Sequence, residues 1–207
     1  MRKIGITGID TNVGKTIVSA IVTEALKSDY WKLIQAGDLD DLDSTIVKQL
    51  ISNSISKIHP ERYLLSEPMS PHAAANIDGV EIKLSDFVVP KLERDIIIEG
   101  AGGLLVPINE EKETVADLFK LLVDEVILVS RHYLGSINHT LLSVNYLQRT
   151  GLKITGIIFV GDENAETERI IAKNTDVFIL GRIPITNQLN QNFIAEQALK
   201  IANELKS

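Results

Sequence analysis

A glycine-bounded turn near the start of the chain carries the residue types best suited to hold a phosphate. Residues 8–16 (GIDTNVGKT) follow a short apolar run and lead into an apolar stretch typical of a helix. Such a turn directs backbone N–H groups and the positive end of a helix dipole toward an anion. Lys15 would reach the terminal phosphates of a nucleotide, and the Thr16 hydroxyl would ligate Mg²⁺. The segment therefore predicts a nucleoside triphosphate site.

The spacing of this turn differs from the usual phosphate-loop pattern, GxxxxGK[ST]. That pattern places its first glycine at position 9, where the chain has Ile9, and Gly8 comes one residue early. A plain strand–turn–helix junction with a surface lysine is the alternative. The strand before the turn, the helix after it and the second glycine favour the nucleotide site.

Carboxylates that follow two other strands could supply metal ligands. Residues 95–99 form an apolar strand that ends in Glu99, beside the glycine-rich residues 100–103. Mg²⁺ prefers oxygen ligands, with one or two carboxylates besides the phosphates. An acidic cluster at residues 38–43 offers a further ligand. For each of these aspartates a solvated loop or a helix cap is the alternative, and Asp43 opens a predicted helix.

Lys32 lies inside the strand predicted at residues 31–35. A lysine within a sheet is unusual unless its side chain points into a polar site. One interpretation is a second cation that faces the triphosphate or a developing carboxylate. The other is a charge on an edge strand.

A second candidate anion site precedes the clearest amphipathic helix, at residues 134–139 (LGSINH). Ser136 is predicted to cap this helix and to leave first-turn N–H groups free for a carboxylate. Ordinary capping is the alternative. We expect His139, like His72, to be a structural histidine.

The alternation of short apolar runs with amphipathic ones predicts the elements that position these residues. Strands are predicted at residues 4–7, 31–35, 95–99, 125–130, 156–160 and 177–180, and helices from near residues 15, 43, 84, 114, 137, 166 and 192. Several strands are rich in Ile and Val on both faces, as in parallel sheets covered by helices. We therefore expect a three-layer α/β fold with a mainly parallel central sheet, whose ligands bind at the carboxyl ends of the strands.

Residues 1–207 show no linker and no internal repeat, so we predict one domain. Residues 52–78, with three prolines, form the one irregular stretch and are interpreted as a long loop, a feature that is often functional.

The composition excludes several classes of protein. The chain has 207 residues, of which 44% are hydrophobic and 24% charged, as in soluble globular proteins. A net charge of −7 leaves no generally basic surface for nucleic acid or an anionic membrane. The absence of cysteine excludes thiol catalysis and zinc–thiolate sites. Neither a membrane span nor a secretory signal is evident, so a cytoplasmic protein is expected.

Together these segments resemble the dethiobiotin synthetases. The matching pieces are residues 8–16, 31–37, 67–72, 99–103, 107, 134–139 and 181–184, in the order of that family. The resemblance implies a P-loop NTPase fold, a homodimer and an ATP- and Mg²⁺-dependent cyclo-ligase of biotin synthesis. In the implied reaction 7,8-diaminononanoate, CO₂ and ATP give dethiobiotin, ADP and phosphate. One amine captures CO₂ as a carbamate, the γ-phosphate activates it as a mixed anhydride, and the second amine closes the ring.

The resemblance also implies roles for individual residues. Lys15 and Lys32 are the implied catalytic residues, and Thr16, Asp43 and Glu99 are the implied Mg²⁺ ligands. The implied nucleotide contacts are Asn12, Val13, Gly14, Lys15, Thr16, Ile17, Asp43, Glu99, Gly100, Ala101, Gly102, Val160, Gly161, Pro184, Ile185 and Thr186. The implied substrate contacts are Lys32, Ala36, Gly135, Ser136, Ile137 and Asn138, with residues 135–138 supplied by the partner subunit.

Three positions depart from the family pattern. Leu33 stands where a proline usually follows the lysine, and Ala36 stands where a serine often contacts substrate. Val160 takes the place of an expected adenine-reading asparagine. Since valine forms no amide pair, either another nucleotide is accepted or backbone groups read the base.

Three other classes of protein share parts of this pattern. A ParA/MinD-like dimerising ATPase switch would carry its signature lysine where this chain has Asp10. Amidotransferase relatives such as the cobyrinate diamide synthetases add a glutaminase domain with a catalytic cysteine, which is not found here. A nucleotide-binding paralogue without turnover is the third alternative, and the three departures are its basis.

Overall fold

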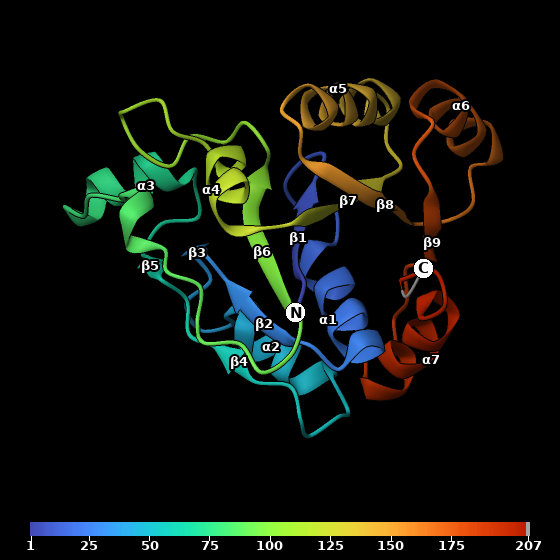
Figure 1. Cartoon of the computed structure of the whole chain (residues 1–207), viewed down its shortest axis with the longest axis horizontal. Helices are drawn as coiled ribbons and strands as arrows, with labels where there is room; N and C mark the ends of the chain where they lie inside the picture. Colours follow the sequence, from blue (N-terminus) through green and yellow to red (C-terminus); the bar gives the residue numbers. More distant parts are fainter. Residues whose placement is uncertain (206–207) are drawn as a thin grey trace.

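The computed structural model describes residues 1–205, and within them a seven-stranded sheet runs through the middle of the molecule (Figure 1). Its strand order is β4-β2-β6-β1-β7-β8-β9, and every neighbouring pair is parallel. These strands are β1 (Lys3–Gly8), β2 (Asp29–Lys32), β4 (Ile58–His59), β6 (Ile96–Gly103), β7 (Glu125–Arg131), β8 (Lys153–Val160) and β9 (Ile179–Ile183). A small parallel sheet pairs β3 (Ile34–Ala36) with β5 (Tyr63–Leu65).

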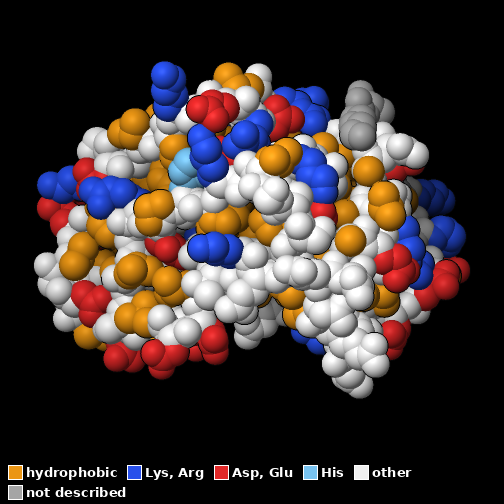
Figure 2. All heavy atoms as spheres, turned by 90° about the horizontal axis from the view of Figure 1, so that it is seen from below, with side chains coloured by type: hydrophobic (Ala, Val, Ile, Leu, Met, Phe, Trp, Pro, Cys, Tyr) orange, Lys and Arg blue, Asp and Glu red, His pale blue; other side chains and the backbone are white. Residues whose placement is uncertain are grey.

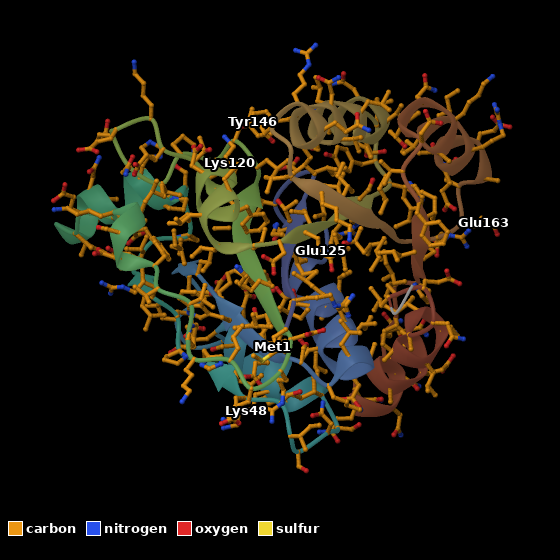
Figure 3. The ribbon with its side chains drawn as sticks, viewed as in Figure 1. Met1, Lys48, Lys120, Glu125, Tyr146 and Glu163 are labelled. Atoms are coloured by element: carbon orange, nitrogen blue, oxygen red, sulfur yellow. The ribbon has the colours of Figure 1, made fainter. Side chains whose placement is uncertain are left out.

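Helices cover both faces of the large sheet. In Figure 1, α4 (Val115–Leu122), α5 (Ser136–Arg149) and α6 (Ala165–Thr175) lie on one side, and α1 (Lys15–Leu26), α2 (Asp43–Leu50) and α7 (Gln191–Ile201) lie on the other. Figure 3 shows Lys120 of α4 beside Tyr146 of α5, with the Lys120 Nζ 5.7 Å from the ring centroid. The predicted three-layer α/β fold with a mainly parallel sheet is confirmed.

The alternation of side chains along β1 explains how the layers pack. Ile4 and Ile6 point to one face and are almost completely buried with Val18 and Ile21 of α1. Gly5, between them, leaves room on the other face, where a Cβ would lie 2.9 Å from Cε2 of Phe119. The missing side chain therefore lets α4 approach the strand closely.

The strand predicted at residues 31–35 is in fact two strands that belong to different sheets. The Leu33 N–H continues the ladder of the large sheet by donating to the Glu99 carbonyl at 3.2 Å. The Leu33 carbonyl instead accepts from the N–H groups of Arg62 and Tyr63, at 3.1 and 3.3 Å. The chain thus passes from one sheet to the other at Leu33.

Two predictions about secondary structure were wrong in part. Residues 52–78 hold β4, β5 and α3 (Pro71–Asp78), which begins at a proline and ends at Gly79 in the left-handed region. The helix expected near residue 84 is a single 3₁₀ turn, Leu84–Asp86. Phe87 ends it by turning inward against Tyr63, with ring centroids 5.6 Å apart.

The described residues 1–205 contain no helix long and apolar enough to cross a bilayer. On the face drawn in Figure 2, acidic, basic and hydrophobic side chains are interspersed.

Candidate active site

A cavity of about 610 Å³ opens where β1, β2 and β6 reach their carboxyl ends. It is lined by the turn before α1 and the start of that helix, the end of β2, the small strand β3, the start of α2, the glycine-rich end of β6, and residues 68–71 at the start of α3. The lining includes eleven of the residues expected to bind nucleotide, metal or substrate, namely Asn12, Gly14, Lys15, Thr16, Ile17, Lys32, Ala36, Asp43, Glu99, Ala101 and Gly102.

Lys15 opens α1, and its side chain turns back over the loop that precedes it. Its Nζ donates a hydrogen bond to the backbone carbonyl of Asp10 at 2.9 Å. Burial, together with the neighbouring charge of Lys32, lowers the pKa of Lys15 to about 8. The loop therefore holds a lysine that lacks a carboxylate partner among the hydrogen bonds and ion pairs of residues 1–205, which suits it to an incoming phosphate.

The second cation lies at the end of β2, among carboxylates. The Lys32 Nζ is 3.0 Å from Oε1 of Glu99 and 2.5 Å from Oδ2 of Asp43, and it donates to the carbonyl of Gly100 at 3.1 Å. The Lys32 and Glu99 side chains are 6% and 0% exposed. Since β2 pairs with both β4 and β6, Lys32 is on an interior strand, and the edge-strand interpretation is wrong.

The Thr16 hydroxyl joins the same cluster. Its Oγ1 lies 2.8 Å from Oδ1 of Asp43 and 3.2 Å from Oε1 of Glu99. A hydroxyl and two carboxylates thus converge from α1, α2 and β6. Such hard oxygen donors fit Mg²⁺.

The charges of this cluster support each other. Burial opposes the charge of Lys32, but the carboxylates of Glu99 and Asp43 outweigh it and raise the lysine pKa. Burial also opposes the charge of Asp43, and there Lys32 and the Thr16 hydroxyl keep the pKa of the carboxyl below its usual value. Lys32 is therefore an ammonium ion and Asp43 a carboxylate at neutral pH.

The cap alternative for Asp43 and the cap predicted at Ser136 were both wrong. Leu42 is the N-cap of α2, and the Asp43 side chain points to Lys32 and Thr16. Ser136 is the first residue of α5, not its cap, because Gly135 takes the cap position with φ of 108°. Glycine adopts this left-handed backbone conformation readily. The helix therefore begins one residue earlier than predicted.

The remaining predicted residues lie outside the cavity. Val13 is buried beneath the loop and Gly100 contributes its carbonyl to Lys32. Val160 abuts Gly14, since a Cβ at Gly14 would lie 3.2 Å from Cγ1 of Val160. The Gly161 N–H donates to the carbonyl of Ile183 at 3.0 Å, which places residues 184–186 beside the end of β8.

Residues 135–138, expected to hold the substrate carboxylate of the other subunit, begin α5 and do not line the cavity of their own chain. The loop before them touches the phosphate loop. Tyr133 donates to Oδ2 of Asp10 at 3.3 Å, and Arg131 donates to the Asn12 carbonyl at 3.1 Å. The Tyr133 hydroxyl also lies 2.7 Å from Nδ1 of His139.

No role was assigned from the sequence to three parts of this site, although residues 31–37 and 67–72 matched the family pattern. Gln35 accepts a hydrogen bond from the Asp43 N–H at 3.4 Å, and residues 68–71 line the cavity. Tyr30 donates to Oε2 of Glu99 at 2.9 Å. The sequence could have indicated Tyr30, because it is two residues before Lys32 and the alternation of side chains along a strand puts both on one face of β2.

The chain is similar over its length to named synthetases. A family model described as an AAA domain matches residues 2–192. A protein of Christiangramia forsetii named ATP-dependent dethiobiotin synthetase BioD is 53% identical over 200 residues, which are 97% of this chain and 96% of that protein. A protein of Cytophaga hutchinsonii with the same name is 47% identical, over 97% of each chain. The chain belongs to the dethiobiotin synthetase family.

Solved structures resemble this synthetase-family fold at low sequence identity. A putative plasmid partition protein of Borrelia burgdorferi bound to AMPPNP has a TM-score of 0.63 and 17% identity, over 99% of this chain and 98% of that chain. The septum site-determining protein MinD of Pyrococcus horikoshii, complexed with Mg-ADP, has a TM-score of 0.60 and 17% identity, over 100% and 96%. The likeness confirms the predicted P-loop NTPase fold, and it is evidence for the fold alone.

Proposed function

We propose that this member of the dethiobiotin synthetase family closes the ring of dethiobiotin from 7,8-diaminononanoate and CO₂ at the expense of ATP. The observation that carries the proposal is the convergence of Lys15, Lys32, Thr16, Asp43 and Glu99 at one end of the cavity. It occurs in a chain 53% identical to a protein named for this activity.

The two lysines have distinct roles in this proposal. Lys15 and the backbone N–H groups at the start of α1 orient the terminal phosphates of ATP. Lys32 holds its charge beside the phosphate loop, where it stabilises the carbamate as its oxygen attacks the γ-phosphorus. The bond between the γ-phosphorus and the β–γ bridging oxygen breaks in this step, and ADP leaves. The second amine then attacks the carbamate carbon and gives up a proton, the C–O bond to phosphate breaks, and inorganic phosphate leaves.

Thr16, Asp43 and Glu99 would hold Mg²⁺. When bound, the ion supplies neutralisation of the phosphate charge. Their convergence within 3.2 Å of the Thr16 hydroxyl supports the assignment.

The base-binding region is proposed to lie at the ends of β8 and β9. Val160, which packs against Gly14, offers no polar atom from its side chain. Backbone groups of Gly161 and of residues 184–186 would therefore read the base. Comparison of ATP, CTP, GTP and UTP as cosubstrates tests this assignment.

A homodimer with shared sites is also part of the proposal. Leu134, just before α5, is fully exposed, and Ile137 in the first turn of that helix is exposed too. Exposed apolar side chains of this kind are suited to an interface with a second copy. Residues 135–138, which follow Leu134, would reach the partner's substrate. A cytoplasmic location likewise remains a prediction from the sequence.

One assay tests the reaction. The protein is incubated with 7,8-diaminononanoate, bicarbonate, Mg²⁺ and ATP, and dethiobiotin is sought by mass spectrometry. We expect dethiobiotin and ADP in equal amounts. If the protein binds ATP but forms no dethiobiotin with ATP, CTP, GTP or UTP, it is instead a paralogue that lacks turnover.

A further inference from the structure

Tyr30 is a buried polar residue that the proposed mechanism does not use. Its side chain is completely buried, and its hydroxyl donates to Oε2 of Glu99 at 2.9 Å. Glu99 is equally buried, and its other oxygen, Oε1, lies 3.0 Å from Nζ of Lys32 and 3.2 Å from Oγ1 of Thr16. The two oxygens of one carboxylate thus have different partners, one on each side.

The sheet fixes this division. In the register of β2 against β6, Lys32 is opposite Glu99 and Tyr30 is opposite Ile97. The Tyr30 N–H donates to the Lys57 carbonyl at 3.0 Å, which holds the same strand from its other edge. Tyr30 therefore has little freedom to follow Glu99 if the carboxylate rotates.

We propose that Tyr30 is a positioning residue that orients the Glu99 carboxylate, so that Oε1 alone faces the metal and Lys32. This inference rests on the proposed function only in taking Mg²⁺ and ATP as the ligands. Groups that orient a metal ligand from behind affect metal affinity by about 10–100-fold. Without its donor, Oε2 would be a buried anionic oxygen with no partner, and the carboxylate would turn toward Lys32 and Thr16 with both oxygens.

The test is the variant Tyr30→Phe, which keeps the ring and removes the hydroxyl. Mn²⁺ binding is measured by electron paramagnetic resonance with a non-hydrolysable ATP analogue. We expect Mn²⁺ affinity to fall about tenfold, and affinity for the analogue without metal to stay unchanged. Tyr63→Phe is the matched control, because Tyr63 is also buried and its hydroxyl donates to the carboxylate of Asp86. It should bind Mn²⁺ as the parent does.

A double-variant cycle separates positioning from general destabilisation. Since Tyr30 is proposed to act through Glu99, Tyr30→Phe should have no further effect on Mn²⁺ affinity in a Glu99→Gln background. Glu99→Gln also removes the buried charge, so this pair of proteins remains informative if the single variant does not fold. Equal losses in both backgrounds, an unchanged affinity in Tyr30→Phe, or the same loss in Tyr63→Phe would each overturn the inference. Mn²⁺ binding needs no turnover, so a failure of the dethiobiotin assay leaves this result separate.

Discussion

Lys32 combines burial with a full charge because two carboxylates surround its ammonium group. We predict that Lys32→Ala lowers kcat for dethiobiotin by about 10²–10³-fold, the usual effect of removing one group that stabilises transition-state charge. Product formation at saturating ATP, followed by mass spectrometry, checks this. Lys48→Ala is the control, since Lys48 is an exposed lysine of the neighbouring helix α2 (Figure 3). Equal rates for the two variants would show that Lys32 has no part in the chemistry.

Glu24 provides a prediction about stability and pH. Its buried carboxylate accepts hydrogen bonds from the N–H and hydroxyl of Ser52, from the N–H and amide of Asn53, and from Lys27. Burial opposes the charge, but these donors lower the pKa of Glu24 from 4.5 to about 2. The stabilisation is therefore fully present above the unfolded-state value and is lost as the pH falls from 4.5 toward 2.

We accordingly expect Glu24→Gln to lower the free energy of unfolding at pH 6 and to lower it much less at pH 3. Urea denaturation of both proteins at the two pH values measures the difference. A loss of the same size at both would mean that the charge of Glu24 contributes nothing.

How much of the site the sequence predicts differs from residue to residue. Lys15 and Thr16 belong to one contiguous motif, so their placement needs only a turn and a helix. From the sequence, Asp43 is as compatible with a helix cap as with a metal ligand. Its role depends on how residues 37–42 bring the chain back to the sheet. Tyr30 has the pattern of an ordinary aromatic residue in a strand, and only the register of β2 against β6 shows its contact with Glu99.

At the scale of elements, the turn after β3 contacts residues 68–71, which line the cavity. Gly37 has φ of 71°, and a Cβ there would lie 2.5 Å from Cβ of Pro68 and 2.6 Å from its Cα. We predict that Gly37→Ala costs roughly 1–2 kcal/mol of stability from the backbone alone. It should also displace residues 68–71 and lower kcat/KM for 7,8-diaminononanoate by about 10–100-fold.

Gly79→Ala separates these two effects. Gly79 has φ of 65° and no atom within 4 Å of an added Cβ. It should lose similar stability in thermal or urea denaturation and keep its kcat/KM. If both variants lose activity alike, the contact with Pro68 is not what matters.

The strands that the sequence analysis missed are the shortest ones. The runs of Ile and Val in β1, β6, β7, β8 and β9 are long enough to predict strands, whereas β4 and β5 have two and three residues. Segments of two or three residues are too short to show the hydrophobic alternation of a strand. In α3, the proline at the start and the glycine after the end were visible, but the prolines around them favoured a loop.

At the scale of the whole molecule, the exposed end of α5 predicts assembly. We expect Leu134→Glu to raise the dimer dissociation constant tenfold or more, equivalent to about 1.4 kcal/mol, because a charge would replace an apolar contact. Light scattering over a range of protein concentrations measures it. Leu199→Glu, at an exposed leucine of α7 on the other side of the sheet, is the control and should leave the mass unchanged. A parent protein that is monomeric at every concentration would rule out shared sites.

The order of the strands in the sheet could not be predicted from the sequence. The alternation of strands and helices predicted the layers, but it does not say that β6 lies between β2 and β1. That placement brings Glu99 beside Lys32 from positions 67 residues apart. The one-domain prediction stays a prediction.

The crossing of the chain between two sheets at Leu33 limits how the site can adapt. Leu33, the residue after Lys32, donates its N–H to the carbonyl of Glu99 and accepts at its own carbonyl from the N–H groups of Arg62 and Tyr63. The Cα of Lys32 is thus fixed by both sheets, and its ammonium group can move only by rotation about side-chain bonds. The backbone of β2 therefore cannot move to bring Lys32 closer to a ligand. A carbamate or phosphate must bind within reach of the Lys32 side chain.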